Sequence, residues 1–199
     1  MPESSEGSKP IRFSFDAKNR EAQKIAREYS AAQITLIDTE TKLAIRQIIA
    51  RSIRDGIPPR DAARLIRDLV GLNRPQAIQL SDYSKRLDPN LKASVRRKAI
   101  ERLAQKLIRR RAVMIARTEV IDALNTGADV AWEQAQQQGI LGKTAKKEWI
   151  ATTGACEVCL ELASKGPVPL KASFGNFRGK PLYRPTAHPN CRCAVAPVP

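Results

Sequence analysis

The chain has 199 residues, which suits one compact domain or two small ones. No apolar run in it approaches the roughly 18 residues that a membrane-spanning helix needs, which excludes an integral membrane protein. Its formal net charge of +15 predicts an anionic partner, whether a nucleic acid, a membrane surface or an acidic protein. Only 5% of the residues are aromatic, so the core must depend on Leu, Ile, Val and Ala, which favours helices.

The first 88 residues are expected to form a tail and a helical region. Residues 1–10 are polar and include Pro and Ser, which predicts a disordered tail without a secretion signal. In the helical region, 11–88, apolar spacing and Pro or Gly boundaries predict four helices: around 20–29, from Asp38 to about Asp55, from Pro58 up to Gly71, and from Asn73 to about Leu87. The last two form either a helix-turn-helix that reads DNA or an ordinary helical hairpin.

Residues 89–145 are expected to form long basic and packing helices. Between Pro89 and Gln138 there is no further proline and only one glycine, Gly127. Such a stretch is too long for an ordinary globular helix, so it either extends as a rod or breaks near residues 109–111. Small residues share one face of its second half, which permits close packing against another helix or against the C-terminal part.

The first half of this stretch carries most of the positive charge. Between Lys85 and Arg117 the chain has twelve Lys or Arg and only two acids, a local net charge of +10. Apolar residues share one helical face and basic residues the opposite one, so this face either is simply solvated or binds phosphate groups in a salt-sensitive, sequence-independent way. The candidate nucleic-acid-binding residues are Lys98, Arg102, Lys106, Arg109, Arg110 and Arg111.

Residues 146–199 contain all four cysteines and the only histidine. Two strands are expected, at 147–151 and at 192–195 with Pro197 ending the second, and about forty residues of loop lie between them. A loop of that length needs a clamp, and a structural zinc site fits better than disulfides, because nothing indicates secretion. The candidate ligands are Cys156, Cys159, His188, Cys191 and Cys193.

Five candidates for four tetrahedral positions leave the ligand set open. The sets Cys156/Cys159/His188/Cys191 and Cys156/Cys159/Cys191/Cys193 are both feasible, since a strand would point Cys191 and Cys193 to one face. The predicted fold class is therefore α+β: a mainly helical N-terminal two thirds with long helices, followed by a small loop-rich β module clamped by zinc.

Several motifs in residues 100–198 resemble those of the phage Mu F-like head morphogenesis proteins, which are minor head proteins of tailed bacteriophages. They are Ala116-Arg117-Thr118-Glu119, a Lys-x-Trp strand, C-x-x-C-x-x-L and the ending His188-Pro189-Asn190-Cys191-Arg192-Cys193. The resemblance assigns Arg117, Thr118 and Glu119 to the family's R-T-E, and the five candidate ligands to its cysteine and histidine positions. Two features depart from the family: residues 152–155 lack its acidic residue and Arg before the first cysteine, and the turn after C-x-x-C is shifted or longer.

The resemblance implies a protein built into the procapsid near the portal. It would lie in the capsid interior of the virion, and in the bacterial host cytoplasm during assembly. Its implied partners are the portal protein, the major capsid or scaffold protein, and packaged double-stranded DNA bound non-specifically, with no membrane. Arg117 and Glu119 cannot face each other on a helix, so each is expected to pin the helix to the zinc module through its own partner, Arg117 by capping carbonyls before Cys191.

Catalysis is not expected. A catalytic zinc keeps an open coordination position beside a general base, and the chain has neither a His-x-Glu motif nor a His-Asn-His cluster. The alternatives to a structural head protein are a zinc-containing nucleic-acid-binding protein, a zinc-dependent nucleic-acid enzyme, and a sequence-specific regulator that uses residues 58–87.

Overall fold

The computed structural model describes residues 39–198, so the expected tail at 1–10 and the helix around 20–29 lie outside the described residues. The described part of the chain is mainly helical, 57%, with a small C-terminal β module, as the predicted fold class requires. The helices are α2 (Thr39–Arg54), α3 (Pro59–Arg67), α4 (Arg74–Arg86), α5 (Ala93–Gln137) and α6 (Glu157–Ser164). The strands are β1 (Lys146–Ile150), β2 (Val168–Pro169), β3 (Asn176–Phe177), β4 (Lys180–Pro181) and β5 (Ala194–Val198).

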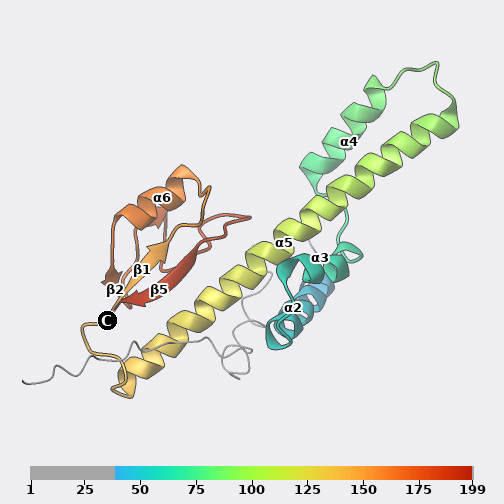
Figure 1. Ribbon diagram of the computed structural model, residues 1–199. Coiled ribbons are helices and arrows are strands. Elements are labelled where there is room, and N and C mark those ends of the chain that lie inside the picture. Colours follow the sequence, from blue (N-terminus) through green and yellow to red (C-terminus); the bar gives the residue numbers. More distant parts are fainter. Residues whose placement is uncertain (1–38, 199) are drawn as a thin grey trace, which may run out of the picture.

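Helix α5 is a single rod of 45 residues to which the other elements attach (Figure 1). At 1.5 Å per residue it is about 68 Å long. It does not break at 109–111. Within this run the Arg111 side chain turns inward and donates a hydrogen bond to the Gly71 carbonyl, 2.8 Å away. The helix ends at Gln137, and Gly139, just beyond the C-cap residue Gln138, has a φ of 72° that other residues rarely adopt.

Helices α2 and α3 pack on the middle of α5 and form the first of two cores. Large aliphatic side chains from α2 and α3, such as Ile45, Ile49 and Ile66, are completely buried there. They meet a row of small residues on α5, including Ala112 and Ala116, which lets the helices approach closely. The predicted small-residue face is therefore a helix-packing face.

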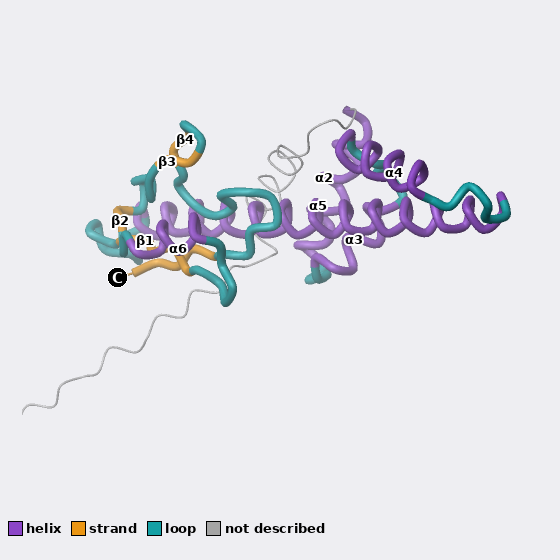
Figure 2. The backbone as a smooth tube through the Cα atoms, turned by 90° about the horizontal axis from the view of Figure 1, so that it is seen from above, coloured by secondary structure: helices purple, strands orange, loops and turns teal. Residues whose placement is uncertain are grey.

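Helix α4 runs alongside the first half of α5 and contacts no other described helix (Figures 1 and 2). It begins with a capping box in which Asn73 accepts from the Gln76 amide and the Gln76 side chain accepts from the Asn73 amide. The helix-turn-helix interpretation is wrong, and so is the hairpin, because α3 and α4 do not pack against each other within the described chain.

The C-terminal module packs on the second half of α5. Its main sheet has the antiparallel order β2-β1-β5, and β3 and β4 form a separate two-stranded sheet. Trp149 of β1 meets Phe174 edge to face, with ring centroids 5.4 Å apart, in a second core. None of the described helices is long and apolar enough to cross a membrane.

Two predictions for this module were wrong. The last strand begins at Ala194 rather than at Arg192, and Pro197 lies inside it, opposite Lys147. β5 is an edge strand, where a missing amide hydrogen is tolerated. In addition, the expected forty-residue loop contains α6, whose eight residues follow directly on Cys156.

Candidate functional site

Cys156 and Cys159 are positioned by the start of α6. Cys156 is the residue that precedes the helix, and Cys159 lies in its first turn, so the two thiols are three residues apart on one side. Gly154, with a φ of 72°, makes the turn that leads into the helix. Cys156 is exposed, whereas Cys159 is only 1% exposed and belongs to the second core.

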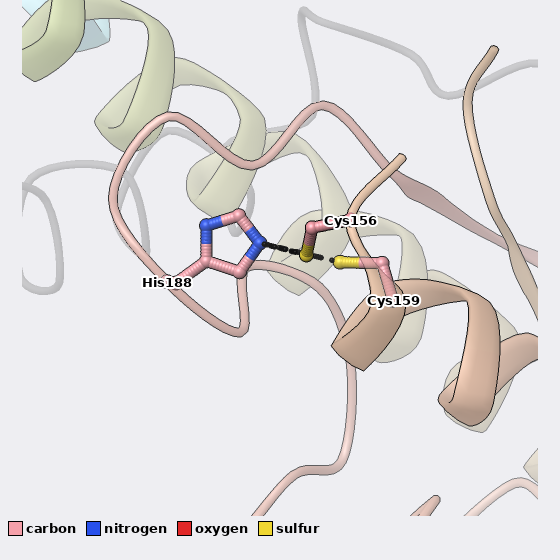
Figure 3. Close-up of side chains that lie close together, drawn as sticks. All are labelled: Cys156, Cys159 and His188. Atoms are coloured by element: carbon pink, nitrogen blue, oxygen red, sulfur yellow. Dashed lines mark hydrogen bonds between the residues drawn. The ribbon is translucent and has the colours of Figure 1, made fainter. Parts of the chain in front are cut away.

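His188 reaches these two thiols from the loop before β5 (Figure 3). Its Nε2 atom lies 3.1 Å from Cys156 Sγ and 3.3 Å from Cys159 Sγ. Its Nδ1 atom lies 2.9 Å from the Pro189 carbonyl oxygen, which can only accept a hydrogen bond. A hydrogen bond to this carbonyl uses the proton on Nδ1, so Nε2, the ring nitrogen that faces the thiols, is the atom placed to bind a metal.

Cys191 and Cys193 form a second group with Cys159. The Sγ atoms of Cys159 and Cys191 are 3.8 Å apart, and all three thiols are buried. A tetrahedral zinc bound to two thiolates at about 2.3 Å would hold their sulfur atoms about 3.8 Å apart. The donor atoms of Cys156, Cys159 and His188 lie within 4.8 Å of one another, and so do those of Cys159, Cys191 and Cys193.

The two groups share Cys159 and can hold a metal ion. Both predicted ligand sets contain Cys159, and all five candidates lie in one group or the other. All four cysteines are free thiols, which agrees with the choice of a metal site over disulfides. The strand geometry that was expected to align Cys191 and Cys193 is absent, because both precede β5, and the loop itself brings them to Cys159.

Burial affects the protonation of the thiols in this cluster. Burial, with the nearby Cys191 and Cys193, raises the pKa of the Cys159 thiol far above its ordinary value. Burial also raises the pKa of Cys191. Both groups therefore stay protonated at neutral pH by themselves, and a cation is needed to stabilise adjacent thiolates at this depth.

The Arg-Thr-Glu segment of α5 holds the loop that carries the ligands. The Arg117 guanidinium donates to the Asn190 side-chain oxygen at 2.6 Å. The backbone N–H of Asn190 donates to the Thr118 hydroxyl at 2.8 Å. Arg117 thus reaches the loop before Cys191 as expected, but it bonds a side chain instead of capping carbonyls. Glu119 is 1% exposed, which places it inside the molecule.

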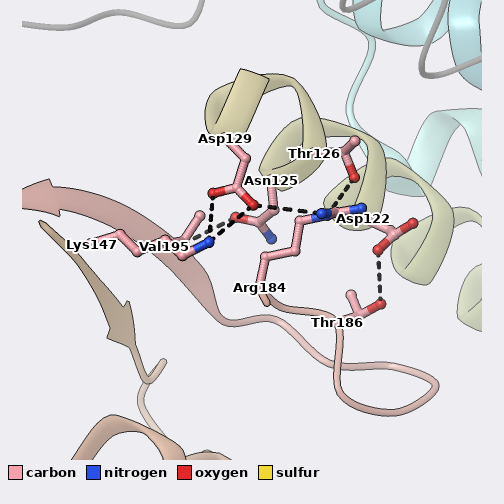
Figure 4. A network of polar contacts seen from close by, with 8 residues as sticks. All are labelled: Asp122, Asn125, Thr126, Asp129, Lys147, Arg184, Thr186 and Val195. Atoms are coloured by element: carbon pink, nitrogen blue, oxygen red, sulfur yellow. Dashed lines mark hydrogen bonds and ion pairs between the residues drawn. The ribbon is translucent and has the colours of Figure 1, made fainter. Parts of the chain in front are cut away.

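A buried polar network next to the cluster was not foreseen from the sequence (Figure 4). Asp129 of α5 pairs with Lys147 of β1 at 3.4 Å and with Arg184 at 3.5 Å. Asn125 accepts from the Val195 amide and donates to the Cys193 carbonyl, so it links α5 to the ligand loop. Burial raises the pKa of Asp129 and lowers that of Lys147.

One signal in the sequence could have revealed this network. Asp122, Asn125 and Asp129 recur at helical spacing among Ala residues that are otherwise suited to packing. Polar side chains on a packing face of a helix need partners from the element that covers them. The partners themselves, Lys147 and Arg184, are identified only by the tertiary structure.

Five of the six candidate nucleic-acid-binding residues are exposed at the surface, and one is buried. Lys98, Arg102, Lys106 and Arg109 are exposed and recur at helical spacing along one side of α5. Arg110 is also exposed, but it lies about 100° around the helix axis from Arg109 and so outside this line. Arg111 is only 5% exposed and is bonded to Gly71, so it is not part of the basic surface.

Comparison with known proteins defines the class of this chain. The model of a phage-associated family, described as VG15 protein, matches residues 15–199. The protein belongs to the VG15 family. No curated protein and no solved structure matches the chain.

Proposed function

We propose that the protein is a structural, non-catalytic component of the phage head that contacts packaged double-stranded DNA through α5. Membership of a phage-associated family supports the viral setting. The observation that carries the proposed contact with DNA is the exposed basic side of α5, where four cations stand in line from the part beside α4 to the part that packs against α3. Contacts from such a surface go to phosphates and carry no sequence preference.

The same helical arm, α4 with the first half of α5, is proposed to contact the portal protein, or the major capsid or scaffold protein. The resemblance to Mu F-like head proteins supports partners of this kind. The arm also exposes large apolar side chains, Ile78 at 53%, Leu91 at 39% and Val95 at 47%, which a protein partner would cover. Incorporation would place the protein in the capsid interior of the virion.

We further propose that the metal is zinc and that its role is structural. Thiolates and a neutral imidazole are the donors that zinc prefers, and the sulfur spacing fits tetrahedral coordination. The two groups that share Cys159 together offer five donors for four positions, so protein side chains can fill every position without water or substrate. This supports a closed site, in contrast to the open site of a zinc enzyme.

Mass spectrometry of purified phage particles and of DNA-free procapsids tests the proposal. The protein is expected in both, because a structural component is incorporated before packaging and retained after it. Its absence from both would overturn the proposed role. Metal-dependent cleavage or modification of DNA by the purified zinc-loaded protein would instead favour the enzyme.

A further inference from the structure

A hollow between α3 and α5 is surrounded by arginine side chains. Three come from α3, namely Arg60, Arg64 and Arg67, and the fourth is Arg109 of α5. Ala63 and Val113 also line the hollow, whose volume is about 290 Å³. Four guanidinium groups around one hollow are typical of an anion-binding site, because each guanidinium presents several N–H donors in a planar fork.

Internal ion pairing accounts for only part of this charge. Arg64 pairs with Asp61 at 3.3 Å and Arg67 with Asp68 at 3.0 Å, but both pairs are largely exposed and contribute little. Arg60 and Arg109 take part in no ion pair within residues 39–198. Four like charges at one place repel one another unless an anion lies between them.

Two further hollows follow it along α5. It shares Arg109 with a hollow of about 520 Å³ on the outer side of α5, which shares Arg102 and Lys106 with one of about 430 Å³ between α4 and α5. We call the three together the basic track. The cations that line the track are Arg60, Arg64, Arg67, Arg86, Lys98, Arg102, Lys106 and Arg109, and the only acid among its lining residues is Glu101.

The helical repeat of α5 explains why its exposed cations lie on the side that faces α3. Arg109 and Ala116 are seven residues, or about two turns, apart and therefore share a side of the helix. On that side α5 packs its alanines in the core with α2 and α3, and exposes its cations where that packing ends. The basic side of α5 therefore leads directly to α3 and its arginines.

We propose that the α3–α5 hollow binds the phosphate backbone of duplex DNA that lies along the basic track. Lys98 and Val113 are about 22 Å apart along α5, which matches roughly six base pairs of DNA at 3.4 Å each. This proposal rests on the DNA contact already proposed for α5, and adds a clamp from α3, a helix distant in sequence. Arginine forks bind phosphate oxygens in pairs, which suits a backbone held at a fixed position.

Salt-dependent binding of the full-length, metal-loaded protein to a labelled duplex of mixed sequence tests the proposal. The test variant is Arg60→Gln/Arg109→Gln, and the control is Lys171→Gln/Lys180→Gln, which removes the same charge from exposed sites of the β module. If both arginines contact phosphates, the negative slope of log K against log salt becomes shallower by about 1.8 in the test variant. The control is expected to keep the wild-type slope.

Three outcomes would overturn the proposal. Equal changes in test and control variants would show that only net charge matters. A wild-type protein that binds no duplex would refute the DNA contact as well, while its presence in phage particles is measured separately. Binding of an acidic polypeptide, lost in Arg60→Gln/Arg109→Gln while duplex binding persists, would assign the hollow to a protein partner.

Two further variants keep the comparison interpretable. Arg60→Lys/Arg109→Lys retains the charge but removes the planar forks, and is expected to keep the slope while binding more weakly. If the double glutamine variant does not fold by circular dichroism, Arg64→Gln against Lys171→Gln makes the same comparison in the same hollow, with an expected slope change of about 0.9.

Discussion

Cys159 is the residue common to both parts of the candidate metal site. It lies 3.3 Å from His188 Nε2 and 3.8 Å from Cys191 Sγ, and it is the donor common to both groups. Its side chain also belongs to the second core, beside Trp149 and Leu162. Whichever four residues bind the metal, a change at Cys159 affects both the coordination and the packing.

Replacing Cys159 with Ala should abolish metal binding and unfold the β module while leaving the other helices largely intact. Native mass spectrometry measures the metal content, and thermal unfolding measures the stability. Ser164→Ala, at the opposite end of α6, is the control and is expected to retain one metal per chain. Unchanged metal content and unchanged melting in the Cys159 variant would contradict a structural metal site.

The same measurement on His188→Ala and Cys193→Ala identifies the ligand set. The variant that removes a true ligand should lose metal affinity, because an alanine leaves one of four coordination positions without a protein donor. The variant that removes the fifth, uncoordinated donor should keep one metal per chain. Equal retention in both would contradict both predicted sets.

A second prediction concerns the buried pair of Lys147 and Asp129, whose side chains are 2% and 10% exposed. Lys147→Met leaves the Asp129 carboxylate buried with Arg184 as its remaining cationic partner. The expected loss is about 3 kcal/mol in the free energy of unfolding, measured with urea. Lys147→Met/Asp129→Asn removes both charges and should recover most of it; equal losses in single and double variants would contradict the pairing.

The residues of the metal site could be predicted from the sequence, but those of the network could not. The five donors stand out because soft ligands at short spacings have few other uses in a chain of this kind. Arg111 illustrates the reverse case. It continues the basic run by sequence, yet the Gly71 carbonyl, forty residues away, satisfies it inside the molecule. Only the tertiary structure distinguishes a buried arginine from an exposed one.

At the scale of elements, α5 has two different environments along its length. Its middle is covered by α2 and α3, whereas residues 93–106 contribute nothing to that core and lie beside α4, none of whose described side chains is buried. The link between α4 and α5 includes a hydrogen bond from the Gln76 side chain to the Leu107 carbonyl, 3.1 Å long. The arm therefore has little apolar burial of its own.

Amide hydrogen exchange should show this difference. The amides of α4 and of residues 93–106 are expected to exchange faster than those of residues 112–126, because local opening is easiest where few apolar contacts are lost. Mass spectrometry of the full chain resolves the two regions within one helix, so each serves as the reference for the other. Equal protection along α5 would contradict an independently opening arm.

Element prediction succeeded where one physical signal dominated. Pro58, Pro59 and Asn73 mark the starts of α3 and α4 because proline and an asparagine cap favour first turns. The sequence left open whether α5 breaks at 109–111, because a sequence alone does not show which groups surround three consecutive arginines. Helix α6 was missed because eight residues give too short a repeat, and its first residue follows a cysteine already interpreted as a ligand.

At the scale of the whole molecule, one helix joins two separate cores. The first contains aliphatic side chains of α2, α3 and the middle of α5, such as Ile45 and Ile66. The second contains both tryptophans of the chain, Trp132 and Trp149, together with Cys159, Cys191 and Cys193. Three of the five candidate metal ligands therefore belong to the second core, and the first core contains none of the five.

Removing the metal should accordingly unfold the two ends of the molecule at different temperatures. Tryptophan fluorescence reports only the second core, whereas far-ultraviolet circular dichroism is dominated by the helices. A chelator is expected to lower the fluorescence transition strongly, because metal bound only to the folded module stabilises it by mass action. Most of the helical signal should persist to a higher temperature. Fluorescence and circular-dichroism transitions that coincide and shift together with the chelator would instead show a single cooperative unit. The control is Cys159→Ala, whose unfolding temperature should not change with the chelator because this variant binds no metal.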